Sequence, residues 1–169
     1  MSKHQAQLLK NEIEKNKAIY EVNKALSTNY DTSGKELNLA GQNLRDLRFL
    51  PKMIQEFNNL ETLDLSNSDL RKKDSVHQLC QMIDENDSIK SLVLRHCNIN
   101  GNTLTEIADS LTKTKNENLT RLDIRDNPIQ DQQYKVLFGL LQNNKTLLDV
   151  DYTLYDQLNV DKLEKYRRM

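Results

Sequence analysis

Two histidines and two cysteines have the residue types and the spacing of a zinc site. His77 and Cys80 are separated by two residues, which puts them on one face of a helix, and His96 and Cys97 are adjacent further along the chain. Imidazole and thiolate groups are the usual protein ligands of zinc. Both cysteines, however, fall at positions that should face a core, where a free thiol acts as a small apolar side chain. We therefore expect two structural thiols and no metal or other cofactor.

Acids and arginines at regular positions form a second candidate set. Asp64, Asp123 and Asp151 each lie between two apolar residues of an L-x-L pattern, whereas Arg95 and Arg125 directly follow such a pattern. A catalytic pair of carboxylates needs burial that separates its two pKa values, but these positions should lie on an open face. The chain also lacks the GxGxxG, GxxxxGK[ST] and GxSxG motifs. We expect no catalysis, and two interpretations stay open: a solvated surface or a protein-binding face.

An internal repeat predicts the elements that position these side chains. The segment LTRLDIRDNPI, which begins at Leu119, recurs as LETLDLSNSDL from Leu60, as IKSLVLRHCNI from Ile89 and, more weakly, as GKELNLAGQNL from Gly34. Its second apolar position recurs at intervals of 26, 29, 30 and 28 residues, at Leu37, Leu63, Leu92, Leu122 and Val150. A period near 28 with this pattern is the leucine-rich-repeat signature.

Segments with helical periodicity separate these strand patterns. Apolar residues recur at helical spacing in SVHQLCQMIDEN (75–86), TLTEIADSLTKTKNEN (103–118) and QQYKVLFGLLQNN (132–144). Each repeat is therefore predicted to be one strand followed by one helix.

On these motifs, the chain resembles leucine-rich-repeat proteins of the long-repeat, ribonuclease-inhibitor-like class over residues 34–152. The resemblance implies an α/β fold, a short solenoid of about four to five strand–helix repeats with a parallel concave sheet and helices on the convex side. It also implies that the chain acts by protein recognition. The structural repeat positions would be Leu63, Leu65, Leu92, Leu94, Cys97, Leu122, Ile124 and Asn127.

A polar residue is expected to point inward where each strand pattern ends. At that point backbone groups turn into the solenoid, and a small polar or thiol side chain can satisfy them. Asn127 suits this role best, and Cys97 and Ser68 occupy the same position in the two preceding repeats. In the first repeat the position falls on Gln42, so that turn should depart from the pattern.

Segments on both sides of the repeats are predicted to extend the solenoid. Residues 1–33 read as an amphipathic helix followed by a linker, and residues 153–169 contain a second helical pattern with Leu158, Leu163 and Tyr166. A short solenoid exposes an apolar face at each end and needs caps. The two extensions are therefore interpreted either as caps or as helices that dock a partner.

Composition limits the classes of partner. Lys and Arg total 24 against 25 for Asp and Glu, so the net charge of -1 argues against nucleic acid. No apolar run approaches the roughly 20 residues that a membrane span needs. Two cysteines and an N-terminus without an apolar signal sequence favour an intracellular, cytoplasmic location, in which the cytoskeleton, a cilium or a mitochondrion are all possible.

The function favoured by these observations is a non-catalytic protein-interaction module without a small-molecule substrate. By analogy with the family, we expect a structural or scaffold subunit of a large cytoskeletal or ciliary assembly. The alternatives are a reversible inhibitor or adaptor, and an actin-regulating domain that resembles the repeat region of tropomodulin. We also expect charge reversal at Arg95 and Arg125 to spare folding and to weaken binding. The expected contact residues are Asp64, Val93, Arg95, His96, Arg121, Asp123, Arg125 and Asp151.

Overall fold

The computed structural model describes residues 4–8, 10, 31–42, 44, 47–113, 117–130 and 133–153. Residues 4–8 and 10 are helical, and the rest of the predicted N-terminal helix lies outside the described residues, as does the segment 154–169. The strands are β1 (Glu36–Asn38), β2 (Thr62–Asp64), β3 (Ser91–Val93), β4 (Arg121–Asp123) and β5 (Asp149–Asp151). The helices between them are α2 (Leu50–Ile54), α3 (Lys73–Glu85), α4 (Gly101–Lys113) and α5 (Tyr134–Asn143).

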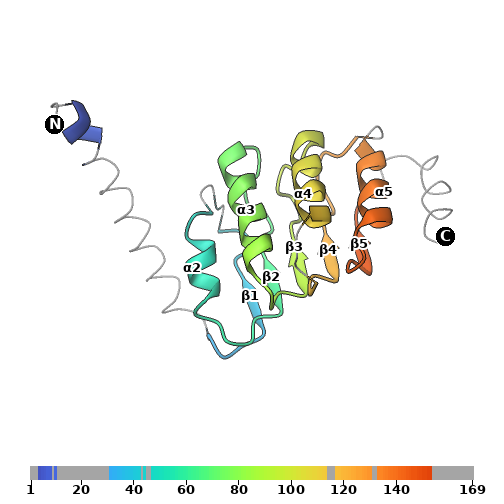
Figure 1. Ribbon diagram of the computed structural model, residues 1–169, viewed down its shortest axis with the longest axis horizontal. Coiled ribbons are helices and arrows are strands. Elements are labelled where there is room, and N and C mark those ends of the chain that lie inside the picture. Colours follow the sequence, from blue (N-terminus) through green and yellow to red (C-terminus); the bar gives the residue numbers. More distant parts are fainter. Residues whose placement is uncertain are drawn as a thin grey trace.

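The strands form one parallel sheet whose order follows the chain, β1-β2-β3-β4-β5. Each of the strands β1 to β4 is followed by a helix that returns along one side of the sheet, so the helices form one layer and the strands the other (Figure 1). Within the described residues, no helix is both long enough and apolar enough to cross a membrane. The predicted α/β solenoid of strand–helix repeats is confirmed.

The sheet register aligns the leucines that mark the repeat. Leu37, Leu63, Leu92, Leu122 and Val150 are paired across the five strands. Each is 7% exposed or less, so the column forms the centre of the core. Residues at alternate strand positions point to opposite faces, which leaves the intervening side chains on the strand side of the sheet.

The helices cover the sheet with their apolar stripes. In α4, Leu104, Ile107, Ala108 and Leu111 are buried at the spacing that puts them on one face. The predicted helices 75–86, 103–118 and 132–144 correspond to α3, α4 and α5 with shifted ends. Each of these three helices packs beside its neighbour.

The first repeat contains a helix that periodicity did not predict. Helix α2 spans five residues, with Pro51 in its first turn, where a missing amide hydrogen is harmless. Leu50, Met53 and Ile54 are buried, and Phe57 follows at 5% exposed. This segment supplies the core of the first repeat with a single helical turn.

Candidate functional site

Asn127 ties two repeats together where β4 ends. Its Oδ1 accepts hydrogen bonds from the amides of Cys97 at 2.8 Å and Ile99 at 3.0 Å. Its Nδ2 donates to the carbonyls of Leu94 at 2.8 Å and Ile124 at 2.9 Å. With 1% of its surface exposed, Asn127 satisfies four buried backbone groups that water does not reach.

The equivalent positions of the other repeats satisfy fewer groups. Cys97 Sγ donates to the carbonyls of Leu65 at 3.3 Å and Arg95 at 3.4 Å, whereas Ser68 Oγ is buried and has no hydrogen-bond partner in the part of the chain that the structure describes. Gln42 is exposed, so the first repeat departs from the pattern as expected. This position is structural in every repeat in which it is buried.

The residue before this position adopts a left-handed backbone. Asn67, His96 and Asp126 have φ values of 63°, 52° and 60°, and Gly41 has 76°. Asn, Asp and His tolerate this region better than other side chains, and glycine adopts it freely. The turn therefore explains these residue types, including His96, without reference to a ligand.

Three polar residues on the strand side hold the start of the same turn. Asn38 Oδ1, Asp64 Oδ1 and Asp123 Oδ1 each accept the amide hydrogen of the residue two positions later, at 2.9, 2.8 and 3.1 Å. This is a local side-chain-to-backbone turn. The aligned acids thus have a structural role before any partner is considered.

Asp123 is more enclosed than an open, solvated face would allow. It is 3% exposed, because the side chain of Arg125 folds back over it and donates from Nε to Oδ1 at 2.9 Å. Burial by itself would raise the pKa of Asp123, but hydrogen bonds from the side chain and amide of Arg125 outweigh it and lower this pKa. The expected open, solvated position of Asp123 was therefore wrong, because Asp123 lies in the interior of the turn, whereas its contact with a partner stays a prediction.

The expected tolerance of Arg125 to charge reversal also changes. Arg125 neutralises a carboxylate that has almost no solvent access, and its own pKa is raised by the hydrogen bond with Asp123. A glutamate at this position would leave two acids together, one of them buried, so it should destabilise the fold.

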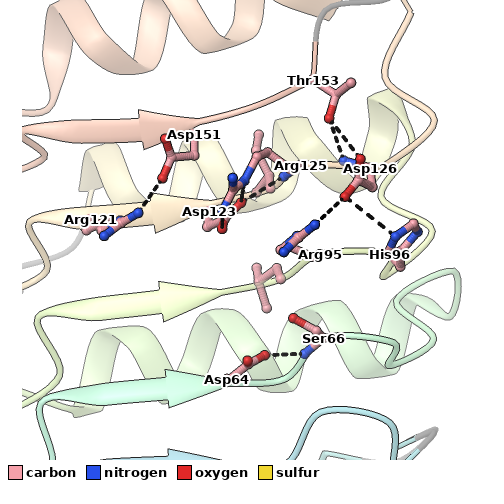
Figure 2. Close-up of polar contacts among 12 residues, drawn as sticks. Asp64, Ser66, Arg95, His96, Arg121, Asp123, Arg125, Asp126, Asp151 and Thr153 are labelled. Atoms are coloured by element: carbon pink, nitrogen blue, oxygen red, sulfur yellow. Dashed lines mark hydrogen bonds and ion pairs between the residues drawn. The ribbon is translucent and has the colours of Figure 1, made fainter.

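Arg95 points to the next repeat, not to Arg125. Its Nη2 lies 2.9 Å from Asp126 Oδ2, and His96 Nε2 lies 3.5 Å from the same oxygen (Figure 2). The other oxygen of Asp126 accepts a 3.2 Å hydrogen bond from Thr153 Oγ1. The pKa of Asp126 is lowered, mainly by the hydrogen bond from Arg95. Sequence reasoning did not select Asp126 or Thr153, although an acid directly before the inward Asn127 was a visible signal.

The last ion pair of this face joins β4 and β5. Arg121 Nη2 lies 2.7 Å from Asp151 Oδ2, and the hydrogen bond raises the pKa of Arg121. Val93 occupies the aligned position of β3 and is partly exposed. We call the eight expected contact residues together the strand face, which consists of Asp64, Val93, Arg95, His96, Arg121, Asp123, Arg125 and Asp151.

The histidines and cysteines do not converge. His77 and Cys80 line an open groove of about 640 Å³ between α3 and α4, whereas His96 contacts Asp126 at the strand ends. Within the described part of the chain, no three His, Cys, Asp or Glu residues are grouped so as to hold a metal ion. Burial raises the pKa of Cys80 to about 11 and that of Cys97 to about 12, so neither thiol is an activated nucleophile.

Comparisons with known proteins agree with the repeat. A family model described as "Leucine Rich repeat" matches residues 115–132. The mouse (Mus musculus) protein "NACHT, LRR and PYD domains-containing protein 4C" is 32% identical over 96 residues, which are 56% of this chain and 10% of that protein. The chain therefore spans about a tenth of the length of this relative.

Two solved structures are similar over most of their length. The match to "Leiomodin-1 Actin-Binding Site 2 (ABS2)" has a TM-score of 0.65 and 20% identity, and covers 88% of this chain and 86% of that one. The match to the tropomodulin C-terminal domain of Caenorhabditis elegans has a TM-score of 0.64 and 15% identity, with 89% and 91% covered. Together with the five aligned strands, these matches show that the protein is a short leucine-rich-repeat solenoid.

Proposed function

We propose that this chain is a non-catalytic protein-binding module and that the strand face contacts its partner. The observation that carries the proposal is the fixed array of half-exposed arginines. The side chains of Arg95, Arg121 and Arg125 are 43%, 51% and 42% exposed, although each is held by an acid. Guanidinium groups held in this way need little further ordering when a partner binds, and their pattern selects its register.

The chemistry of the face favours binding over catalysis. Among the described residues, the acids of this face are held by arginines or turn amides, and both thiols have raised pKa values. The strand spacing near 28 residues also suits the long-repeat, ribonuclease-inhibitor-like class. Members of this class would act by recognition.

Within this function, we favour an intracellular structural subunit of a cytoskeletal assembly, with a ciliary assembly as one form of it. The likeness in fold to leiomodin and tropomodulin domains supports the cytoskeletal choice over an unrelated inhibitor or adaptor. The extensions 1–33 and 153–169 would then serve as docking helices or caps.

Crosslinking of the tagged protein, purified from its own cells under gentle salt, tests this assignment. Stoichiometric partners crosslinked through Lys35 and Lys90, which lie at the entry to the strands, would support docking on the strand face. Crosslinks confined to the segment 3–24 or to Lys162 and Lys165 would move the interface to the end helices. Recovery as a free monomer would refute the structural-subunit role.

Actin is the second candidate partner, because one similar structure is titled as an actin-binding site. The wild-type protein should co-sediment with purified actin filaments. A variant in which Arg95 and Arg121 are both replaced by Glu should stay in the supernatant. Lys113→Glu is the matched control, since this exposed lysine lies on α4, on the helix side of the sheet. No co-sedimentation of the wild type, or equal loss by the control, would exclude actin binding through the strand face.

A further inference from the structure

Two repeats place the same acid in different surroundings. Asp123 and Asp64 occupy the same strand position, and each accepts the amide hydrogen of the residue two positions later. At Asp123 that residue is Arg125, whose guanidinium also covers the carboxylate through Nε and Nη2. At Asp64 it is Ser66, which has no charge to offer.

The neighbouring guanidinium does not compensate for this difference. Arg95, the next residue along the column from Ser66, directs its Nη2 to Asp126 at 2.9 Å. In the part of the chain that the structure describes, the hydrogen bond of the Asp64 carboxylate is the one from the Ser66 amide at 2.8 Å (Figure 2). Asp64 is therefore the acid of this column that remains available to a cation from outside.

A second, independent feature lies at the same place. Ser66 is 7% exposed, and its Oγ is buried without a hydrogen-bond partner among the described residues. Figure 2 shows the Ser66 side chain on the same side of the sheet as Asp64, below Arg95. A buried hydroxyl without a partner costs free energy, and it can accept a hydrogen bond as well as donate one. This hydroxyl would be satisfied by a donor that reaches Asp64.

We propose that Asp64, Ser66 and Val93 form a receptor for one arginine side chain of a protein partner. The guanidinium takes the place at Asp64 that Arg125 takes at Asp123, with paired N–H groups on the carboxylate and a further N–H toward Ser66 Oγ. The partly exposed methyl groups of Val93, in the adjacent strand, contact the aliphatic stem.

The chemistry of the site selects arginine from other groups. A carboxylate or phosphate of the partner would be repelled by the negative charge of Asp64. A lysine would offer a point charge, whereas the planar guanidinium of arginine can donate two parallel hydrogen bonds to the carboxylate. The inference rests on the proposed protein-binding function, and it adds the chemical group that the partner must present.

Nuclear magnetic resonance with short capped peptides tests the receptor without knowledge of the partner. Three peptides of the form Gly-X-Gly, with X as arginine, citrulline or lysine, are titrated at matched ionic strength in the millimolar range. The amide of Ser66 reports on Asp64, and the amide of Arg125 is the internal control because Asp123 is already covered. We expect the arginine peptide to shift the Ser66 amide and to leave that of Arg125 in place.

Two variants remove the site in different ways. Asp64→Asn keeps the turn, as Asn38 does in the first repeat, but should abolish the shift of the Ser66 amide. Ser66→Arg supplies the guanidinium within the chain and should abolish binding while it stabilises the fold. Asp109→Asn, an exposed acid on α4, should bind the arginine peptide as the wild type does.

Several results would overturn the receptor. These are no shift at the Ser66 amide, equal shifts with citrulline or lysine, and an unchanged shift in Asp64→Asn. Should Ser66→Arg fail to fold, the Asp64→Asn result still decides. Because the probe is a peptide, a failed search for a cytoskeletal partner would leave this outcome unchanged, so the two proposals fail separately.

Discussion

Replacement of Asn127 by alanine should be among the most damaging single changes to a polar residue of the solenoid. The side chain satisfies the amides of Cys97 and Ile99 and the carbonyls of Leu94 and Ile124 at 2.8 to 3.0 Å. Each buried backbone group left without a partner costs about 1–3 kcal/mol, and partial relaxation reduces the sum to roughly 3–5 kcal/mol. Since small domains are stable by only about 5–15 kcal/mol, the loss is large.

The equivalent position of the second repeat provides a matched control. Ser68 is 1% exposed, as Asn127 is, but within the described residues its Oγ has no hydrogen-bond partner. Ser68→Ala should therefore change the free energy of unfolding by less than about 1 kcal/mol. The two alanine variants differ in the hydrogen bonds that they remove and share the same burial.

Urea unfolding followed by far-ultraviolet circular dichroism measures both changes. With a slope of about 2 kcal/mol/M, Asn127→Ala should lower the midpoint by about 2 M without a change in slope. A loss below about 1 kcal/mol, or an equal loss in Ser68→Ala, would show that the turn does not depend on this side chain.

Three further predictions follow from burial and charge. Asp123→Asn keeps the turn acceptor but loses charge-assisted hydrogen bonds, so it should cost about 1–3 kcal/mol at pH 7. Because the folded pKa of Asp123 is lowered, this difference should shrink as the pH falls from the unfolded value of about 3.9 through the folded one; a constant gap in unfolding measurements at each pH would contradict it. Leu122→Asp, at 0% exposed, should unfold the protein, whereas Leu148→Asp, at 81% exposed, should not; retention of the far-ultraviolet spectrum and melting temperature by the first variant would refute the repeat alignment. Cys80 and Cys97, with pKa values of about 11 and 12, should react with iodoacetamide at pH 8 far more slowly than a free cysteine and should regain normal reactivity in urea; fast labelling of either thiol in the folded protein would contradict its raised pKa.

The core could be predicted from the sequence because the leucine spacing and the geometry of parallel strands impose the same pattern. Leu63, Leu92 and Leu122 recur at near-constant intervals, and the register pairs them directly. Helix α2 could not be predicted in this way, since five residues with Pro51 complete little more than one turn and show no period. Its residues are buried because they pack against the neighbouring repeat, and not because the local sequence favours a helix.

Two asparagines at helix ends carry a sequence signal that lies outside the strand motif. Asn86 and Asn144 belong to Asn-x-Ser/Thr sequences, which resemble glycosylation sites. In the structure they end α3 and α5, and each Oδ1 accepts the amide of the residue three positions later, at 2.8 and 2.7 Å. The recurrence of this motif after two predicted helices was a sequence signal for the turn back to the next strand.

The surroundings of the turn residues on the strand side were harder to predict because each of these side chains depends on the residue two positions later. Asn38, Asp64 and Asp123 make the same turn, yet Asp123 is buried and Asp64 is not. The difference comes from Arg125 and Ser66, whose side chains either cover the preceding acid or leave it open. In this solenoid a charged residue is therefore best judged against its equivalents in the other repeats. An acid that its own repeat neutralises stabilises the turn, and an acid that lacks the repeated cation is where a partner can supply one.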